Sequence, residues 1–248
     1  TRLSSHVGEF QGWLTHNELS DAQTDLRLTQ LQERLREDRL NVAFVAEFSR
    51  GKSELINAIF FADYGNRMLP SSAGRTTMCP TELLYDAGKP PCIELLPIQT
   101  RASNSGVTEY KSFPDEWTVV ELDIDSPEAM QDALRHVSET TRVTPAEAAR
   151  LGFEVGQGEI DLYLIGDDGL VDVPRWRHAV INFPHPLLKQ GLVILDTPGL
   201  NAIGAEPELT LSQLPNAHAV LFILAADSGV THSDLAIWKE HICAGGTA

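Results

Sequence analysis

Residues 42–57 of the chain read Val-Ala-Phe-Val-Ala-Glu-Phe-Ser-Arg-Gly-Lys-Ser-Glu-Leu-Ile-Asn. The apolar, β-branched and aromatic residues at 42–45 predict a buried strand, and the residues from Gly51 onward predict a helix. Only a short connection separates the two elements. A strand, a tight loop and a helix that opens with Gly-Lys-Ser form the usual context of a phosphate-binding loop. The stretch therefore predicts an α/β fold with a site for a nucleoside triphosphate.

Each part of this stretch suits the binding of phosphate groups. Successive backbone N–H groups can wrap the phosphates, and the helix N-terminus adds a partial positive charge. Lys52 can reach the β- and γ-phosphates, and the Ser53 hydroxyl can coordinate Mg²⁺. Ala46 stands where the first glycine of the motif is usual, and its methyl group would weaken binding if its φ were positive. The residues predicted to contact the nucleotide are Glu47, Phe48, Ser49, Arg50, Gly51, Lys52, Ser53 and Glu54.

A second stretch, residues 192–200, reads Leu-Val-Ile-Leu-Asp-Thr-Pro-Gly-Leu. Its first four residues predict another buried strand. Asp196, at the carboxyl end of that strand, can hold Mg²⁺ through water, and the Gly199 N–H can contact a γ-phosphate. Taken alone, Asp-Thr-Pro-Gly is an ordinary turn. With the Gly-Lys-Ser loop upstream, the nucleotide site is the better interpretation.

Composition excludes several classes of partner. The chain carries 35 acidic residues against 19 Lys plus Arg, which gives a formal charge of −16. This charge argues against electrostatic binding of nucleic acid. The same charge argues against binding to anionic lipid through this segment. Three separated cysteines and the lack of a signal peptide fit a reducing cytosol, so the expected location is cytoplasmic.

The flanking segments complete the predicted architecture. Residues 1–40 predict a helical segment without a turn-rich break, either an arm of a bundle or stalk or a helix packed on its own domain. Residues 84–190 predict an inserted α+β subdomain, with strands that include 160–165, and residues 206–214 a short helix. Residues 219–224 are a third apolar strand run. Strands that alternate with helices predict a doubly wound, mostly parallel sheet with flanking helices.

A threonine is expected in the long loop predicted over residues 62–83, which is rich in Gly, Pro, Ser and Thr. Nucleotide switches keep a threonine in such a loop, where it ligates Mg²⁺ when the γ-phosphate is present. We select Thr77 for this role, with Thr76 and Thr81 as alternates. For any single threonine, a solvated loop hydroxyl is the competing interpretation.

Taken together, these motifs resemble the dynamin superfamily of large GTPases, and within it the bacterial dynamin-like proteins. The resemblance covers roughly residues 40–245 and rests on four pieces: the Gly-Lys-Ser loop and its helix, the loop at 74–80, the strand end at 195–200, and residues 222–227 with the Ser-Asp helix that follows. It implies GTP as substrate and Mg²⁺ as cofactor. The chain ends at Ala248, and the base-reading Asn/Thr-Lys-x-Asp motif of the family does not occur in it. We therefore interpret the chain as part of a GTPase domain, within residues 41–248, from a longer protein.

The resemblance also implies roles for particular residues. Ser49 resembles the loop serine that holds a charge-compensating cation or the attacking water, and Thr77 the switch threonine on Mg²⁺. Leu200 stands where small signalling GTPases carry a glutamine, so it cannot orient water. Arg50 and Arg75 are candidate charge-stabilising side chains, in cis or in trans, or exposed phosphate-positioning groups. The predicted catalytic residues are Lys52, Ser49 and Thr77, and the predicted metal ligands are Ser53, Thr77 and Asp196.

Three functions remain open at this point. The first is a Mg²⁺-dependent GTPase that self-associates through its GTPase domains, with membrane remodelling and membrane contact through other parts of the full-length protein. The second is a non-hydrolysing nucleotide-binding scaffold, marked by Ala46 and Leu200. The third is a phosphate-loop ATPase. Phosphate release that depends on Lys52 excludes the second, and the base-reading segment separates the third.

Overall fold

A computed structural model describes the chain except residues 1, 18, 22–23, 26, 30, 33–38, 47–49, 70–78, 104, 154–165, 198–216, 227–228 and 240–248. The chain divides into two compact units, residues 1–40 and 41–248. The predicted strand at 160–165 and the predicted helix at 206–214 lie outside the described residues.

The first unit is helical, but its helix is interrupted. Helix α1 (Arg2–His16) ends where the backbone N–H and the side chain of Asn17 both donate to the Trp13 carbonyl. Asp21 then caps a second helical stretch, since its Oδ1 accepts the Thr24 N–H at 2.7 Å. Asn17 and Asp21 are residues that favour helix ends, which explains a break that the sequence prediction of a continuous segment missed.

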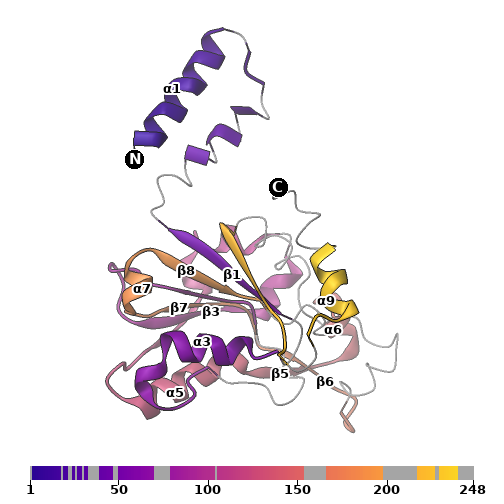
Figure 1. The fold of residues 1–248 in the computed structure, drawn as a ribbon. Helices are drawn as coiled ribbons and strands as arrows, with labels where there is room; N and C mark the ends of the chain where they lie inside the picture. Colours follow the sequence, from indigo (N-terminus) through magenta and orange to yellow (C-terminus); the bar gives the residue numbers. More distant parts are fainter. Residues whose placement is uncertain are drawn as a thin grey trace. The chain divides into compact units, whose positions relative to one another are not determined.

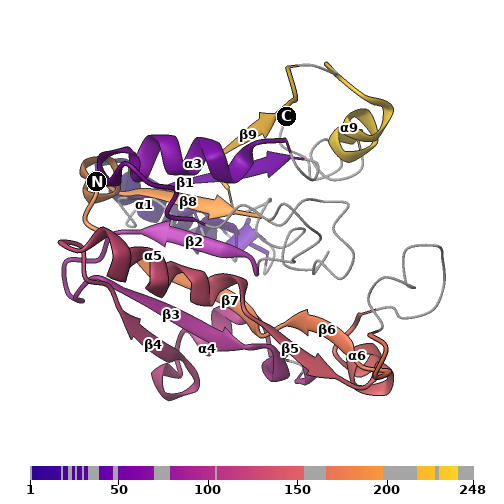
Figure 2. The same cartoon turned by 90° about the horizontal axis from the view of Figure 1, so that it is seen from below.

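The second unit is built on a seven-stranded sheet in the order β4-β3-β7-β2-β8-β1-β9 (Figures 1 and 2). Helices α3 (Lys52–Phe60) and α5 (Pro127–Arg135) cover one face of it and close the main core, with Ile56, Phe60 and Leu134 almost fully buried. The other face carries a smaller core that includes Val45, Val193 and Leu195. The strands are β1 (Leu40–Ala46), β2 (Thr81–Leu84), β3 (Cys92–Pro97), β4 (Thr118–Glu121), β7 (Trp176–Asn182), β8 (Leu192–Asp196) and β9 (Ala219–Ile223).

The sheet is mixed, so the prediction of a mostly parallel sheet holds for its β9-β1-β8 part and for the β2-β7 pair, and is wrong for the other neighbouring strands. β1 and β9 pair in parallel, and β8 runs the same way beside β1 (Figure 2). β2 is antiparallel to β8 and parallel to β7, and β3 is antiparallel to both β7 and β4. Strands β2, β3 and β4 follow one another in the sequence without the long helical crossovers that parallel neighbours require. Successive strands in this part of the chain therefore run in opposite directions.

The predicted inserted subdomain at 84–190 is also corrected, because three of its strands, β3, β4 and β7, extend the main sheet. Of the described residues in this range, a small piece forms a separate sheet. Strands β5 (Thr140–Val143) and β6 (Val171–Pro174) form a two-stranded sheet beside helix α6 (Pro145–Arg150). This piece has its own core, made of Ile98, Val143, Ala148, Leu151, Phe153, Val171 and Val173.

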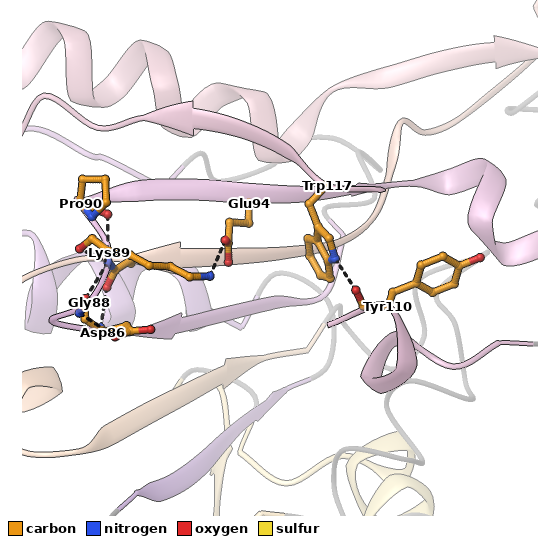
Figure 3. Close-up of polar contacts among 8 residues, drawn as sticks. Asp86, Gly88, Lys89, Pro90, Glu94, Tyr110 and Trp117 are labelled. Carbon is orange, nitrogen blue, oxygen red and sulfur yellow. Dashed lines mark hydrogen bonds and ion pairs between the residues drawn. The ribbon is translucent and has the colours of Figure 1, made fainter. Parts of the chain in front are cut away.

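Other short α-helices in the described part of this unit are α4 (Val107–Tyr110), α7 (Pro186–Lys189) and α9 (His232–Ile237). Helix α4 is tied to β4 by the Trp117 indole, which donates to the Tyr110 carbonyl at 2.9 Å (Figure 3). Within the described part of the chain, no helix is both long and apolar enough to cross a membrane.

Candidate nucleotide site

The first helix of the site opens on a glycine whose backbone only glycine adopts readily. Gly51 precedes α3 with φ 84° and ψ 15°, in the left-handed region, and its carbonyl accepts the Leu55 N–H at 3.0 Å. Among the described residues, no side chain caps the N-terminus of α3. The N–H groups of a helix's first turn can bind an anion, and the helix dipole favours one there.

Lys52 and Asp196 meet, which brings the two predicted stretches together. The Lys52 ammonium lies 2.6 Å from Asp196 Oδ1, and both side chains are about nine-tenths buried. The contact is an ion pair, and it places the Asp196 carboxylate beside the start of α3. Buried oxygen of this kind, with the Ser53 hydroxyl in the first turn of α3, is the hard donor set that Mg²⁺ prefers.

The two strands that carry the site are locked together at their carboxyl ends. Thr197, which is 1% exposed, donates its hydroxyl to the Phe44 carbonyl in β1 at 3.0 Å. Ala46 ends β1 in register with Ile223, so its backbone is extended and the positive φ considered above does not arise. Sequence reasoning quoted Thr197 within its motif but assigned it no role, although a threonine directly after a buried strand was a usable signal.

The other predicted residues fall into two groups. Arg50 and Glu54 are described, and Glu54 forms an exposed ion pair of 2.6 Å with Arg67 on the side of α3. Thr81 is buried within β2 and donates its hydroxyl to the Cys79 carbonyl, so the loop predicted over 62–83 is shorter and this alternate lies in a strand. The predicted residues outside the described part of the chain are Glu47, Phe48, Ser49, Arg75, Thr76, Thr77, Gly199 and Leu200.

Helix α9, on the carboxyl-terminal side of the chain, buries an acidic residue. Asp234, 1% exposed in α9, accepts bonds from the Thr231 N–H and hydroxyl at 2.9 and 2.8 Å, which closes a capping box. The Thr231 N–H, together with the charge of Arg50, lowers the pKa of Asp234 below its usual range. The charge of Arg50 therefore acts on a carboxylate of α9, which is far from it in the sequence.

Comparison with known proteins agrees with this geometry. The pattern described as "Dynamin family" matches residues 42–246, which is most of the chain. The chain belongs to the dynamin family. The resemblance noted from the motifs is thereby confirmed, and the members of this family are GTPases.

Relatives of this dynamin-family chain include a bacterial dynamin-like protein of Nostoc punctiforme, 25% identical over 215 residues. That match covers 87% of this chain but 24% of the relative, so the chain spans about a quarter of its length. Two solved structures of an oligomerised bacterial dynamin pair also match. The first has a TM-score of 0.40 and 21% identity, and the match covers 81% of this chain and 23% of that one. The second has a TM-score of 0.43 and 16% identity, and the match covers 94% of this chain and 34% of that one.

Beside the site, on the opposite sheet face from α3, the dynamin-family chain buries a carboxylate. Glu82 in β2 pairs with Lys111 at 2.8 Å and contacts His178 Nε2 at 3.1 Å, and His178 is fully buried. Burial alone would raise the pKa of Glu82, but the hydrogen bond from His178 and the charges of His178 and Lys111 outweigh it and lower the pKa to about 2. Sequence reasoning missed this cluster, because its members come from β2, β7 and the end of α4.

Replacing Glu82 with Gln is expected to lower the free energy of unfolding by about 3 kcal/mol at pH 7. The pKa in the folded state lies below the ordinary value of 4.5, so the stabilisation is complete above pH 4.5 and is lost as the pH falls toward about 2. Urea unfolding of both proteins at pH 7, 5 and 3.5 measures this, and the difference between them should shrink at pH 3.5.

The matched control is Glu94→Gln, which breaks a more exposed pair with Lys89 and should cost less than about 1 kcal/mol. A Glu82→Gln cost that stays constant from pH 7 to 3.5 would show that packing, not charge, is responsible.

Proposed function

We propose that this chain binds GTP with Mg²⁺ and hydrolyses it, as the catalytic part of a bacterial dynamin-like protein. The observation that carries the proposal is the buried Lys52–Asp196 contact at the N-terminus of α3, which begins after the left-handed Gly51. It joins a phosphate-binding cation to the acid at the end of the neighbouring strand. The family supports guanine as the base, because the members of this family are GTPases.

The residues of the chain divide the work in this proposal. The first-turn N–H groups of α3 and the Lys52 ammonium hold the β- and γ-phosphates and stabilise the charge that develops on them. Ser53, Thr77 and Asp196 would hold the metal, Asp196 through water. When bound, Mg²⁺ neutralises charge on the phosphate oxygens. Ser49 would position the attacking water or a compensating cation, and the Gly199 N–H would contact the γ-phosphate.

The full-length protein is proposed to be cytoplasmic and to couple hydrolysis to assembly. Self-association would occur through paired GTPase domains, and membrane remodelling would use membrane contacts outside residues 1–248. These proposals rest on membership of the family. Nucleic acid is not a proposed partner, since the formal charge of the chain is −16.

The proposal predicts that the full-length protein releases phosphate from GTP in the presence of Mg²⁺. GTP, ATP and GTP with EDTA are compared under the same conditions by continuous phosphate detection. We expect GTP-selective turnover that EDTA removes. GTP binding without phosphate release would favour the scaffold, and equal or faster release from ATP would favour the ATPase.

A further inference from the structure

Asn57 makes three hydrogen bonds to one short piece of backbone. Its side-chain oxygen accepts the Met68 N–H at 3.1 Å and the Leu69 N–H at 2.7 Å, and its nitrogen donates to the Leu69 carbonyl at 3.0 Å. The Asn57 side chain is itself buried, with 8% of the residue exposed. All of these bonds join α3 to residues 68–69, which lie outside the helix.

An asparagine is unexpected at this position on packing grounds. The buried face of α3 otherwise consists of Ile56 and Phe60, which belong to the main apolar core. Burying an amide in such a core is unfavourable unless its polar atoms are hydrogen-bonded. An apolar residue at 57 would pack well but would leave the N–H groups of Met68 and Leu69 without this partner. The role of asparagine at position 57 is therefore to form these hydrogen bonds rather than to make apolar contacts.

The location of these bonds relates them to the nucleotide site. Asn57 stands five residues after Lys52 on the same helix, about 7.5 Å along its axis. Met68 and Leu69 are 1% and 2% exposed, and they directly precede residues 70–78, which carry Thr76 and Thr77. Asn57 thus holds Met68 and Leu69, the two residues that lead into this segment, against the helix that carries Lys52. These two residues are called the entry of the segment.

We propose that Asn57 is a positioning residue for recognition of the γ-phosphate. It acts by holding the entry of the Thr76–Thr77 segment at a set place relative to the N-terminus of α3. The inference rests on the proposed function, because it assumes that a γ-phosphate binds there. Its consequence is specific: loss of the Asn57 bonds should weaken contacts that depend on the γ-phosphate more than contacts to the β-phosphate.

The chain contains a matched control for a purely structural role. Asn182, at the end of β7 and 3% exposed, bonds in the same manner to the turn at 86–90. Asp86, Gly88, Lys89 and Pro90 of this turn are labelled in Figure 3. The side-chain oxygen of Asn182 accepts the Asp86 N–H at 2.7 Å, and its nitrogen lies within 3.2 Å of the carbonyls of Asp86, Lys89 and Pro90. β7 is antiparallel to β8, so the carboxyl end of β7 lies on the same side as the amino end of β8. The turn at 86–90 is therefore at the opposite end of the strands from Asp196.

The test compares Asn57→Ala and Asn182→Ala in the full-length protein, at a temperature where circular dichroism shows both folded. Affinities for GDP and for a non-hydrolysable GTP analogue are measured with Mg²⁺, together with kcat and KM for GTP. Asn57→Ala is expected to lower kcat and the analogue-to-GDP affinity ratio about tenfold each, with GDP affinity changed by less than about threefold. Asn182→Ala is expected to leave the ratio and kcat within about twofold of the wild type.

Asn57→Asp provides a second variant if Asn57→Ala does not fold. It keeps the acceptor for the Met68 and Leu69 N–H groups and loses the donor to the Leu69 carbonyl, so its affinity ratio should fall between those of Asn57→Ala and the wild type. Equal effects of the Asn57 and Asn182 variants, or an Asn57 variant that loses GDP and the analogue alike, would overturn the positioning role alone. A folded wild-type protein that binds no nucleotide would overturn the proposed function, and the positioning role with it.

Discussion

Replacing Lys52 with Ala should lower the rate of phosphate release from GTP by about 10²–10³-fold, the usual cost of removing one charge-stabilising donor from an active site. Lys52 is about nine-tenths buried, lies 2.6 Å from Asp196, and stands in the first turn of α3. Water cannot replace a cation held in this way at low cost. The measurement is kcat/KM for GTP, with steady-state phosphate release in the wild type and the variant.

Lys89→Ala serves as the control for Lys52→Ala. Lys89 also forms a 2.6 Å ion pair, with Glu94 (Figure 3). Glu94 lies in β3, which β7 and β2 separate from the β8 strand that carries Asp196. Loss of the Lys89 side chain should leave kcat/KM within about twofold of the wild type, because distant exposed pairs contribute little. If both lysine variants lose activity equally, or Lys52→Ala retains it, Lys52 does not act on the phosphates.

Asp196→Asn is expected to raise the Mg²⁺ concentration for half-maximal phosphate release by about 10–100-fold, the range found when an outer-sphere metal partner is changed. Asn keeps the size of the side chain and removes the negative charge that would hold the water of the metal. A Mg²⁺ titration at saturating GTP measures the effect. Calorimetric unfolding of the same variant serves as a check, because the change also leaves the Lys52 ammonium without its carboxylate.

A decisive contrast comes from the double variant Lys52→Ala with Asp196→Asn. If the two residues serve one nucleotide, their effects on kcat/KM should not add, since the second change acts on a site already impaired. An Asp196→Asn protein with an unchanged Mg²⁺ requirement would remove Asp196 from the metal site and leave it a structural partner of Lys52.

The parts of the site that the sequence predicted are those with a local pattern. Lys52 follows a buried strand and opens a helix, and Asp196 ends another apolar strand, so each was visible within about ten residues of sequence. Their meeting at 2.6 Å follows from both strands ending at the same edge of the sheet. Local patterns of this kind locate side chains at strand ends with no knowledge of the whole topology.

The parts that the sequence missed depend on distant partners. Thr81 was placed in a loop because β2 is a four-residue strand without polar alternation, recognisable only by its pairing with β7 and β8. Glu82 would be taken for a solvent-facing residue, but it is buried and forms a hydrogen bond with His178, which is 96 positions away in the sequence. Asn57 looks like a flaw in an apolar helix face until the backbone of Met68 and Leu69 is seen beside it.

The most direct test of the central claim, a nucleotide site between α3 and the end of β8, is amide hydrogen exchange of the full-length protein. Exchange is measured with and without a non-hydrolysable GTP analogue and Mg²⁺ at saturation. We predict that added protection concentrates in residues 50–57 and 192–197, with the turn at 86–91 unchanged. Saturable binding of the analogue without protection in 50–57, or with protection confined to other segments, would contradict the account.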